Sequence, residues 1–207
     1  MICVTVFALD TILTWRGNNL MIHFVMIPAE VYMTWEELIA EGFYSYQLKP
    51  FSTLLSYAFL HANAEHITSN LIFIWVFGSL VQRELGAVWF FIILVITAIT
   101  GAIGHIVVKP DSLIPTLGAS GALLGLEGVY FAMALRWRLP NPDVWPISHP
   151  VSQERLMAFA ALGIFLDISG VLSDAQGIAF GAHIGGFIGG FILGTTVIPR
   201  PRHSAQS

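Results

Sequence analysis

Charged residues and cysteines are scarce in this sequence of 207 residues. Nine Lys and Arg and 13 Asp and Glu make up 11% of it, against 56% hydrophobic residues. A typical soluble domain carries about 25% charged residues, so this composition nearly excludes a soluble globular enzyme and a disordered chain. The net charge of −4 gives no basic surface for phosphates, which argues against nucleic-acid binding. The single cysteine, Cys3, excludes a disulfide scaffold and a cysteine-based zinc site. An integral membrane protein remains.

Two uncharged runs are long enough to cross a membrane. Residues 85–108 contain His105 as their one ionisable group, and residues 175–198 contain His183. About 20 apolar residues in an α-helix cross the hydrocarbon core. Each run is predicted as a helix, because an isolated strand could not satisfy its backbone hydrogen bonds in lipid. Weaker runs of the same kind lie at residues 67–81, 113–135 and 156–172.

A sixth apolar run, residues 2–13, is short and contains Asp10. Its length fits the remaining half of a first span whose upstream part lies outside this chain. We therefore predict an all-α, polytopic membrane bundle of six transmembrane helices over residues 1–198, with the first helix cut short. Residues 199–207 are predicted to form a polar cytoplasmic tail.

The positions of Lys and Arg predict the orientation, because positive residues are enriched on the cytoplasmic side. One side holds the turn between the second and third spans, the loop between the fourth and fifth spans, and the C-terminus. It carries Arg83, Arg136, Arg138, Arg155, Arg200 and Arg202. The opposite side carries Arg16, Lys49 and Lys109. The acidic, aromatic segment 18–56 is therefore expected outside, with a short interfacial helix at residues 35–38. A bacterial inner membrane suits such a compact six-span chain.

Polar side chains recur at the start of every second span. His66 and Asn70 open the second span, Ser120 the fourth and His183 the sixth. These three spans run in the same direction, so their first turns share one depth near the outer face. An ionisable residue inside a span costs about 3 kcal/mol or more, which makes each a functional hypothesis. We expect the four side chains to converge.

Such a group could hydrolyse an acyl bond. A serine hydroxyl is a weak nucleophile until a base takes its proton, and histidine is the usual base. Ser120 lies near a helix start, where free N–H groups can face a developing oxyanion. The amide of Asn70 and a ring nitrogen of His66 are further donors, and Gly118 allows a close approach of backbone and substrate.

No carboxylate is assigned to this group. Glu127 lies seven residues after Ser120, which places it about 10 Å deeper in the membrane, too far to orient a histidine at the level of Ser120. Asp167 lies nearer the outer end of the fifth span and could reach polar groups there. The sequence therefore favours a dyad of Ser120 and His183.

The same residues carry a resemblance to a known family. The motifs are His61-x4-His66-x3-Asn70, Gly118-Ala119-Ser120-Gly121 and Gly181-Ala182-His183-Ile184-Gly185-Gly186. In this order they resemble the rhomboid intramembrane serine proteases, over roughly residues 51–194.

The resemblance implies roles for individual residues. Ser120 would be the nucleophile and His183 the base, with His66 and Asn70 lining an oxyanion hole with the Ser120 N–H. The substrate would be a single-pass membrane protein, cut near the outer end of its helix. The loop after the first span would be a half-submerged hairpin, and residues 173–178 a mobile cap. No cofactor is implied.

Some positions depart from the family pattern. Leu124 stands where many members have an aromatic residue that stacks on the catalytic histidine. The Trp-Arg pair often found in the first loop is absent, and Val81-Gln82 replaces the frequent Val-Glu. None of these changes removes a catalytic group.

Less specific interpretations also fit single residues. A serine between glycines usually serves helix packing, as do the glycine ladders 181/185/189 and 186/190/194. A non-catalytic relative that binds membrane helices is one alternative, although it would have no need to keep Ser120 and His183. A metal-dependent hydrolase or transporter is another, but the spacing of five between His61 and His66 does not fit a helical metal motif.

Overall fold

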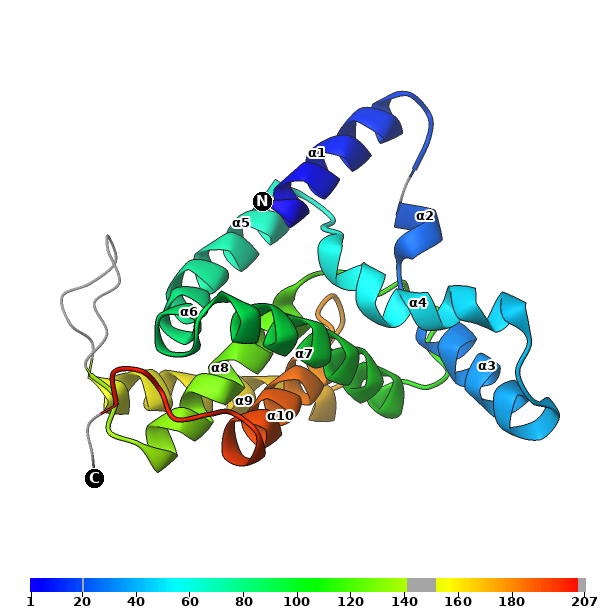
Figure 1. Ribbon diagram of the computed structural model, residues 1–207. Helices are drawn as coiled ribbons and strands as arrows, with labels where there is room; N and C mark the ends of the chain where they lie inside the picture. The colour runs from blue at the N-terminus through cyan, green and yellow to red at the C-terminus, as the bar shows by residue number, and fades with distance from the viewer. Residues whose placement is uncertain (20, 141–151, 205–207) are drawn as a thin grey trace.

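The computed structural model describes residues 1–19, 21–140 and 152–204, and these ranges fold into helices (Figure 1). The described α-helices are α1 Ile2–Trp15, α2 Met21–Phe24, α3 Pro28–Glu41, α4 Leu48–Ser56, α5 Ala64–Phe73, α6 Ser79–Leu85, α7 Ala87–Val108, α8 Ser120–Arg136, α9 Gln153–Leu172 and α10 Phe180–Thr196. Short 3-10 turns lie at Ser45–Gln47 and Tyr57–Phe59, and a π-helical turn, η3, at Ile74–Gly78 joins α5 to α6. The predicted all-α fold is confirmed.

Several helices suit a membrane by length and composition. The continuous helix Ala64–Leu85, together with α7 and α9, is long and apolar enough to cross one. Two further helices, α1 and α10, are apolar but shorter, and α8 has 17 residues. The count of six spans stays a prediction.

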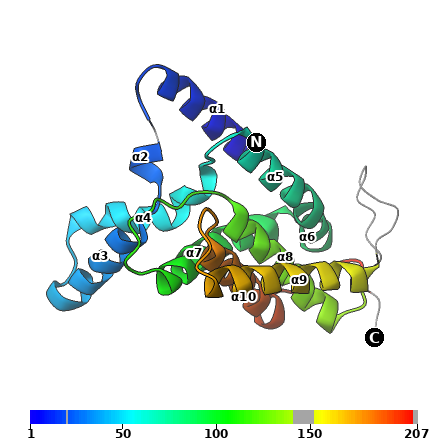
Figure 2. The same cartoon turned by 180° about the vertical axis from the view of Figure 1, so that it is seen from behind.

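The core of the bundle is α8, which is enclosed by its neighbours. Leu126, Val129 and Met133 on this helix are fully buried, and Val81 and Ile93 from adjoining helices pack into the same cluster. Figures 1 and 2 show α7, α8 and α10 side by side, with α9 along their edge. Because α8 begins at Ser120, its first residue stands where these helices meet.

Glycines bring α10 against both α8 and α7. Gly186 lies directly against the carbonyl oxygen of Gly121, and a side-chain carbon there would overlap it. On another face of α10, a Cβ at Gly185 would stand 2.8 Å from the Cα of Gly104 in α7. The helix contact predicted from the glycine ladders is therefore present, and it sets the distance between the helix starts.

Two helices begin later than the apolar runs that predicted them. The run 113–135 becomes helical at Ser120, because Gly118 has a φ of +121° and interrupts the backbone just before it. The run 175–198 becomes helical at Phe180, after a loop in which Asp174 and Gly177 also have positive φ. The interfacial helix expected at residues 35–38 is part of the longer α3.

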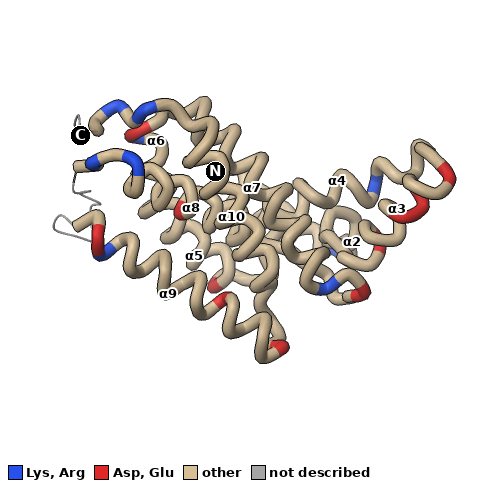
Figure 3. The backbone as a smooth tube through the Cα atoms, turned by 90° about the horizontal axis from the view of Figure 1, so that it is seen from below, with Lys and Arg blue, Asp and Glu red and all other residues tan. Residues whose placement is uncertain are grey.

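Charged side chains lie mostly at the ends of the bundle (Figure 3). Lys and Arg gather where α6 and α8 meet the C-terminal segment, and acidic residues dominate the far end of α3. This distribution agrees with the predicted orientation, which itself stays a prediction. Residues 141–150 of the loop expected after Arg138, and residues 205–207 of the expected tail, lie outside the described ranges.

Candidate active site

Ser120 is held at the start of α8 by a backbone arrangement that only glycine accepts easily. Gly118 adopts its positive φ and donates its N–H to the carbonyl of Tyr57 at 3.0 Å. Tyr57 is buried and donates its hydroxyl to the carbonyl of Ala98 in α7 at 2.9 Å. The loop before Ser120 is therefore fixed to the bundle, and the N–H of Ser120 is one of the first-turn donors that have no partner within a helix.

His183 lies in the first turn of α10 and meets Ser120 directly. Its Nε2 atom is 2.9 Å from Ser120 Oγ, a hydrogen-bonding distance. A Cβ at Gly121 would stand 2.9 Å from the carbonyl oxygen of Ala182, so the backbones beside both residues touch. The two side chains that the sequence predicted to converge therefore lie in contact.

A carboxylate lies on the far side of the His183 ring. Asp167 Oδ1 is 2.9 Å from His183 Nδ1, and Asp167 is buried in α9. The dyad expected from the sequence left this residue out. The one sequence feature that pointed to Asp167 was its position near the outer end of its span. The rotation of α9, which turns Asp167 toward α10, was not readable from the pattern.

An aromatic ring supports the histidine from its own helix. Phe180 meets the ring of His183 edge to face, with centroids 6.5 Å apart. The same phenyl ring fills the space beside Gly170 of α9, where a Cβ would come within 2.6 Å of it. Phe180 thus supplies an aromatic contact that Leu124, at the usual aromatic position, does not.

His66 and Gly118 lie together beside Ser120. A Cβ at Gly118 would stand 2.7 Å from His66 Nε2 and 3.9 Å from Ser120 Oγ. The backbone N–H of His66 donates to Asn63 Oδ1 at 2.8 Å, which caps α5. His66 also packs edge to face on the ring of His61, which is almost fully buried.

Asn70 lies one turn further along α5. It is buried, and its amide Nδ2 has no hydrogen-bond partner among the described residues. An unpaired buried donor is costly, and this amide is free to bond a group that reaches it.

A cavity of about 320 Å³ opens beside His66. His105, Lys109 and Gln176 are among its lining residues, so it lies between the end of α7 and the loop that precedes α10. His105 has no hydrogen-bond partner at Nδ1 among the described residues.

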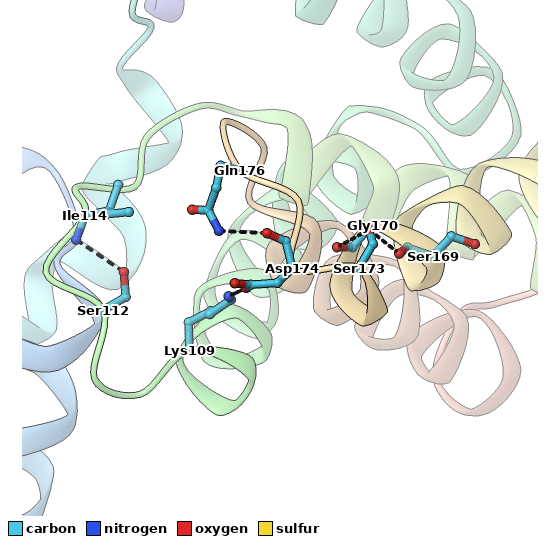
Figure 4. Close-up of polar contacts among 8 residues, drawn as sticks. All are labelled: Lys109, Ser112, Ile114, Ser169, Gly170, Ser173, Asp174 and Gln176. Atoms are coloured by element: carbon cyan, nitrogen blue, oxygen red, sulfur yellow. Dashed lines mark hydrogen bonds and ion pairs between the residues drawn. The ribbon is translucent and has the colours of Figure 1, made fainter.

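The loop that precedes α10 is tied to α7 (Figure 4). Lys109 forms an ion pair with Asp174, and Gln176 donates to the backbone carbonyl of Asp174 at 2.8 Å. This is the segment expected to act as a cap. Its residues 175–178 line the cavity, and residues 173–178 are exposed.

Within residues 1–19, 21–140 and 152–204, no three His, Cys, Asp or Glu side chains are grouped so as to hold a metal ion. Glu127 is buried in α8 and its Oε2 has no hydrogen-bond partner in the described part of the chain.

Comparisons with known proteins agree on one family. The model described as the Rhomboid domain matches residues 49–200. The putative rhomboid protease YdcA of Bacillus subtilis (strain 168) is 30% identical over 145 residues, which cover 70% of this chain and 70% of that protein. Rhomboid-like protein 11, chloroplastic, of Arabidopsis thaliana is 33% identical over 38% of this chain and 28% of its own length. Rhomboid protease GluP of Bacillus subtilis (strain 168) is 35% identical over 40% of this chain and 16% of its own length.

Proposed function

The chain belongs to the rhomboid family, and from that premise we propose that it is an intramembrane serine endopeptidase in which Ser120 is the nucleophile and His183 the general base. Relatives that bear the name rhomboid protease support a protease. The observation that carries the assignment is the 2.9 Å between Ser120 Oγ and His183 Nε2.

The proposed reaction begins with attack of Ser120 Oγ on the carbonyl carbon of the scissile peptide bond, while His183 Nε2 takes the hydroxyl proton. The C–N bond then breaks and His183 returns the proton to the leaving amine. Water attacks the resulting acyl-enzyme, again with His183 as base, and regenerates the serine.

The oxyanion of each tetrahedral intermediate needs donors that are already in place. We assign this role to the N–H of Ser120, the amide of Asn70 and a ring nitrogen of His66. The absence of a Cβ at Gly118 leaves room for His66 beside the serine. The unpaired amide of Asn70 supports this assignment.

The proposed substrates are single-pass membrane proteins within the bilayer. The site residues lie at helix starts, so the cut would fall near one end of the substrate helix. With the orientation predicted from Lys and Arg, that end faces the outside of a bacterial inner membrane.

The proposal is tested with protein purified in detergent and a labelled panel of single-span substrates. Ser120→Ala and His183→Ala should each lower kcat by about 10³-fold or more. Ser79→Ala and His23→Ala change an exposed serine in α6 and an exposed histidine in α2, neither of which is a proposed site residue, and should retain wild-type activity. A fluorophosphonate probe reads the nucleophile without any substrate and should label the wild type at Ser120.

Three results would overturn the assignment. Cleavage by Ser120→Ala would show that Ser120 is not the nucleophile. Loss of cleavage on chelation would favour the metal-dependent alternative. A wild type that cleaves no span and takes no probe would favour the non-catalytic protein that binds membrane helices.

A further inference from the structure

A third polar residue, Asp167, contacts the pair formed by Ser120 and His183. We propose that Asp167 is a positioning residue that holds the catalytic histidine in the tautomer and orientation that the reaction needs. This inference rests on the proposed function of Ser120 and His183 and adds a partner to it.

The order of the hydrogen bonds supports this role. Asp167 Oδ1 and Ser120 Oγ lie 2.9 Å from opposite nitrogens of the same imidazole ring. An ionised carboxylate only accepts hydrogen bonds, so Nδ1 must carry the proton when it bonds Asp167. Nε2 is then left as an acceptor facing the serine hydroxyl, which is the state a general base requires.

The surroundings strengthen the interaction. The side chains of Asp167 and His183 are 11% and 16% exposed, so little solvent reaches the pair. When His183 takes the proton from Ser120, it becomes a cation beside this carboxylate. In a site of low dielectric constant such a pairing is worth more than in water.

Asp167 has no other evident task. Among the described residues, His183 is the one group that the carboxylate hydrogen-bonds. A buried acidic side chain inside an apolar helix is expensive, and such residues are retained where they act.

The packing of α9 holds the carboxylate at the height of the ring. Gly170 lies one turn after Asp167 on the same face of α9, and the phenyl ring of Phe180 fills the space at this glycine. Phe180 also touches the edge of His183. The ring of Phe180 therefore packs between α9 and the histidine of α10.

The test uses Asp167→Asn, which keeps the size of the side chain and removes its charge. In a Ser-His-Asp triad the same exchange lowers kcat about 10⁴-fold, and we expect a fall of at least about tenfold here with KM little changed. The rate of probe labelling should fall in parallel. The pH profile of labelling should change, because Asp167→Asn removes the negative charge beside the reacting imidazole. Asp167→Glu should recover part of the activity.

The matched control is Glu127→Gln, which removes another buried carboxylate without touching His183. It should keep the wild-type pH profile and rate. Melting temperatures of all variants show whether a loss of activity follows a loss of stability.

Two results would overturn the role of Asp167. Wild-type kcat and pH profile in Asp167→Asn would show that the carboxylate is not needed. A fall in rate with an unmoved profile and an equal loss of thermal stability would show a structural role only. In both cases Ser120→Ala would still abolish cleavage, so the proposed protease would stand. If the wild type showed neither cleavage nor labelling, both the proposed protease function and the role of Asp167 would be wrong.

Discussion

Gly186 of α10 lies directly against the carbonyl oxygen of Gly121 in α8. Gly121 follows Ser120 in the chain, and Gly186 lies one turn after His183. Backbone therefore meets backbone next to the two side chains proposed to react. Any group larger than hydrogen at Gly186 must push the helices apart, which would lengthen the 2.9 Å between Ser120 Oγ and His183 Nε2.

The first prediction concerns this contact. Gly186→Ala should lower the unfolding free energy by about 1–3 kcal/mol through overpacking and should reduce kcat more than KM. The matched control is Gly163→Ala in α9, where a Cβ would meet nothing within 4 Å. Gly163→Ala should leave activity unchanged. Its melting temperature should be unchanged or slightly higher, since alanine favours helix. Equal behaviour of the two variants would show that the contact does not control the site.

The second prediction concerns the turn before Ser120. In Gly118→Ala, the new methyl group meets the ring of His66, and a φ of +121° is strained for alanine. We expect kcat to fall by at least about tenfold, because the displaced ring is a proposed oxyanion donor. Gly42→Ala is the control: its φ of +92° is also unfavourable for alanine, but nothing lies within 4 Å of the added carbon. If Gly42→Ala lost as much activity, backbone strain rather than the clash with His66 would be responsible.

Much of this arrangement was open to prediction from sequence. Parity of the spans placed Ser120, His183 and His66 at one depth, and the glycines of α10 indicated its close contacts. Depth follows from counting residues along a helix, which is why the contact between Ser120 and His183 could be predicted. Rotation of a helix about its axis depends on which side chains interlock, and the pattern of α9 does not reveal it. Asp167 therefore reached His183 through the fit of Phe180 beside Gly170, a fit visible only in three dimensions.

The third prediction concerns the buried amide of Asn70. Removal of one oxyanion donor costs about 10²–10³ in rate, so Asn70→Ala should lower kcat by that factor while the fold is retained. The unpaired state of its Nδ2 favours this outcome, because no structural hydrogen bond of that atom to a described residue is lost. Circular dichroism and melting temperature would verify the fold. Asn18→Ala, at an exposed asparagine, is the control. An unchanged rate in Asn70→Ala would remove this residue from the site.

The fourth prediction concerns pH and His61, which precedes α5. Burial, with a smaller contribution from neighbouring His66, lowers the pKa of His61 from its usual 6.5 to about 4. Between these values the unfolded chain binds a proton that the folded protein does not. The stability due to the neutral ring is therefore complete above pH 6.5 and is lost as pH falls toward 4. The melting temperature in detergent should fall over this range, and His61→Gln should fall less steeply. His23→Gln, at an exposed histidine, should follow the wild type. Parallel curves for wild type and His61→Gln would show that another group causes the acid sensitivity.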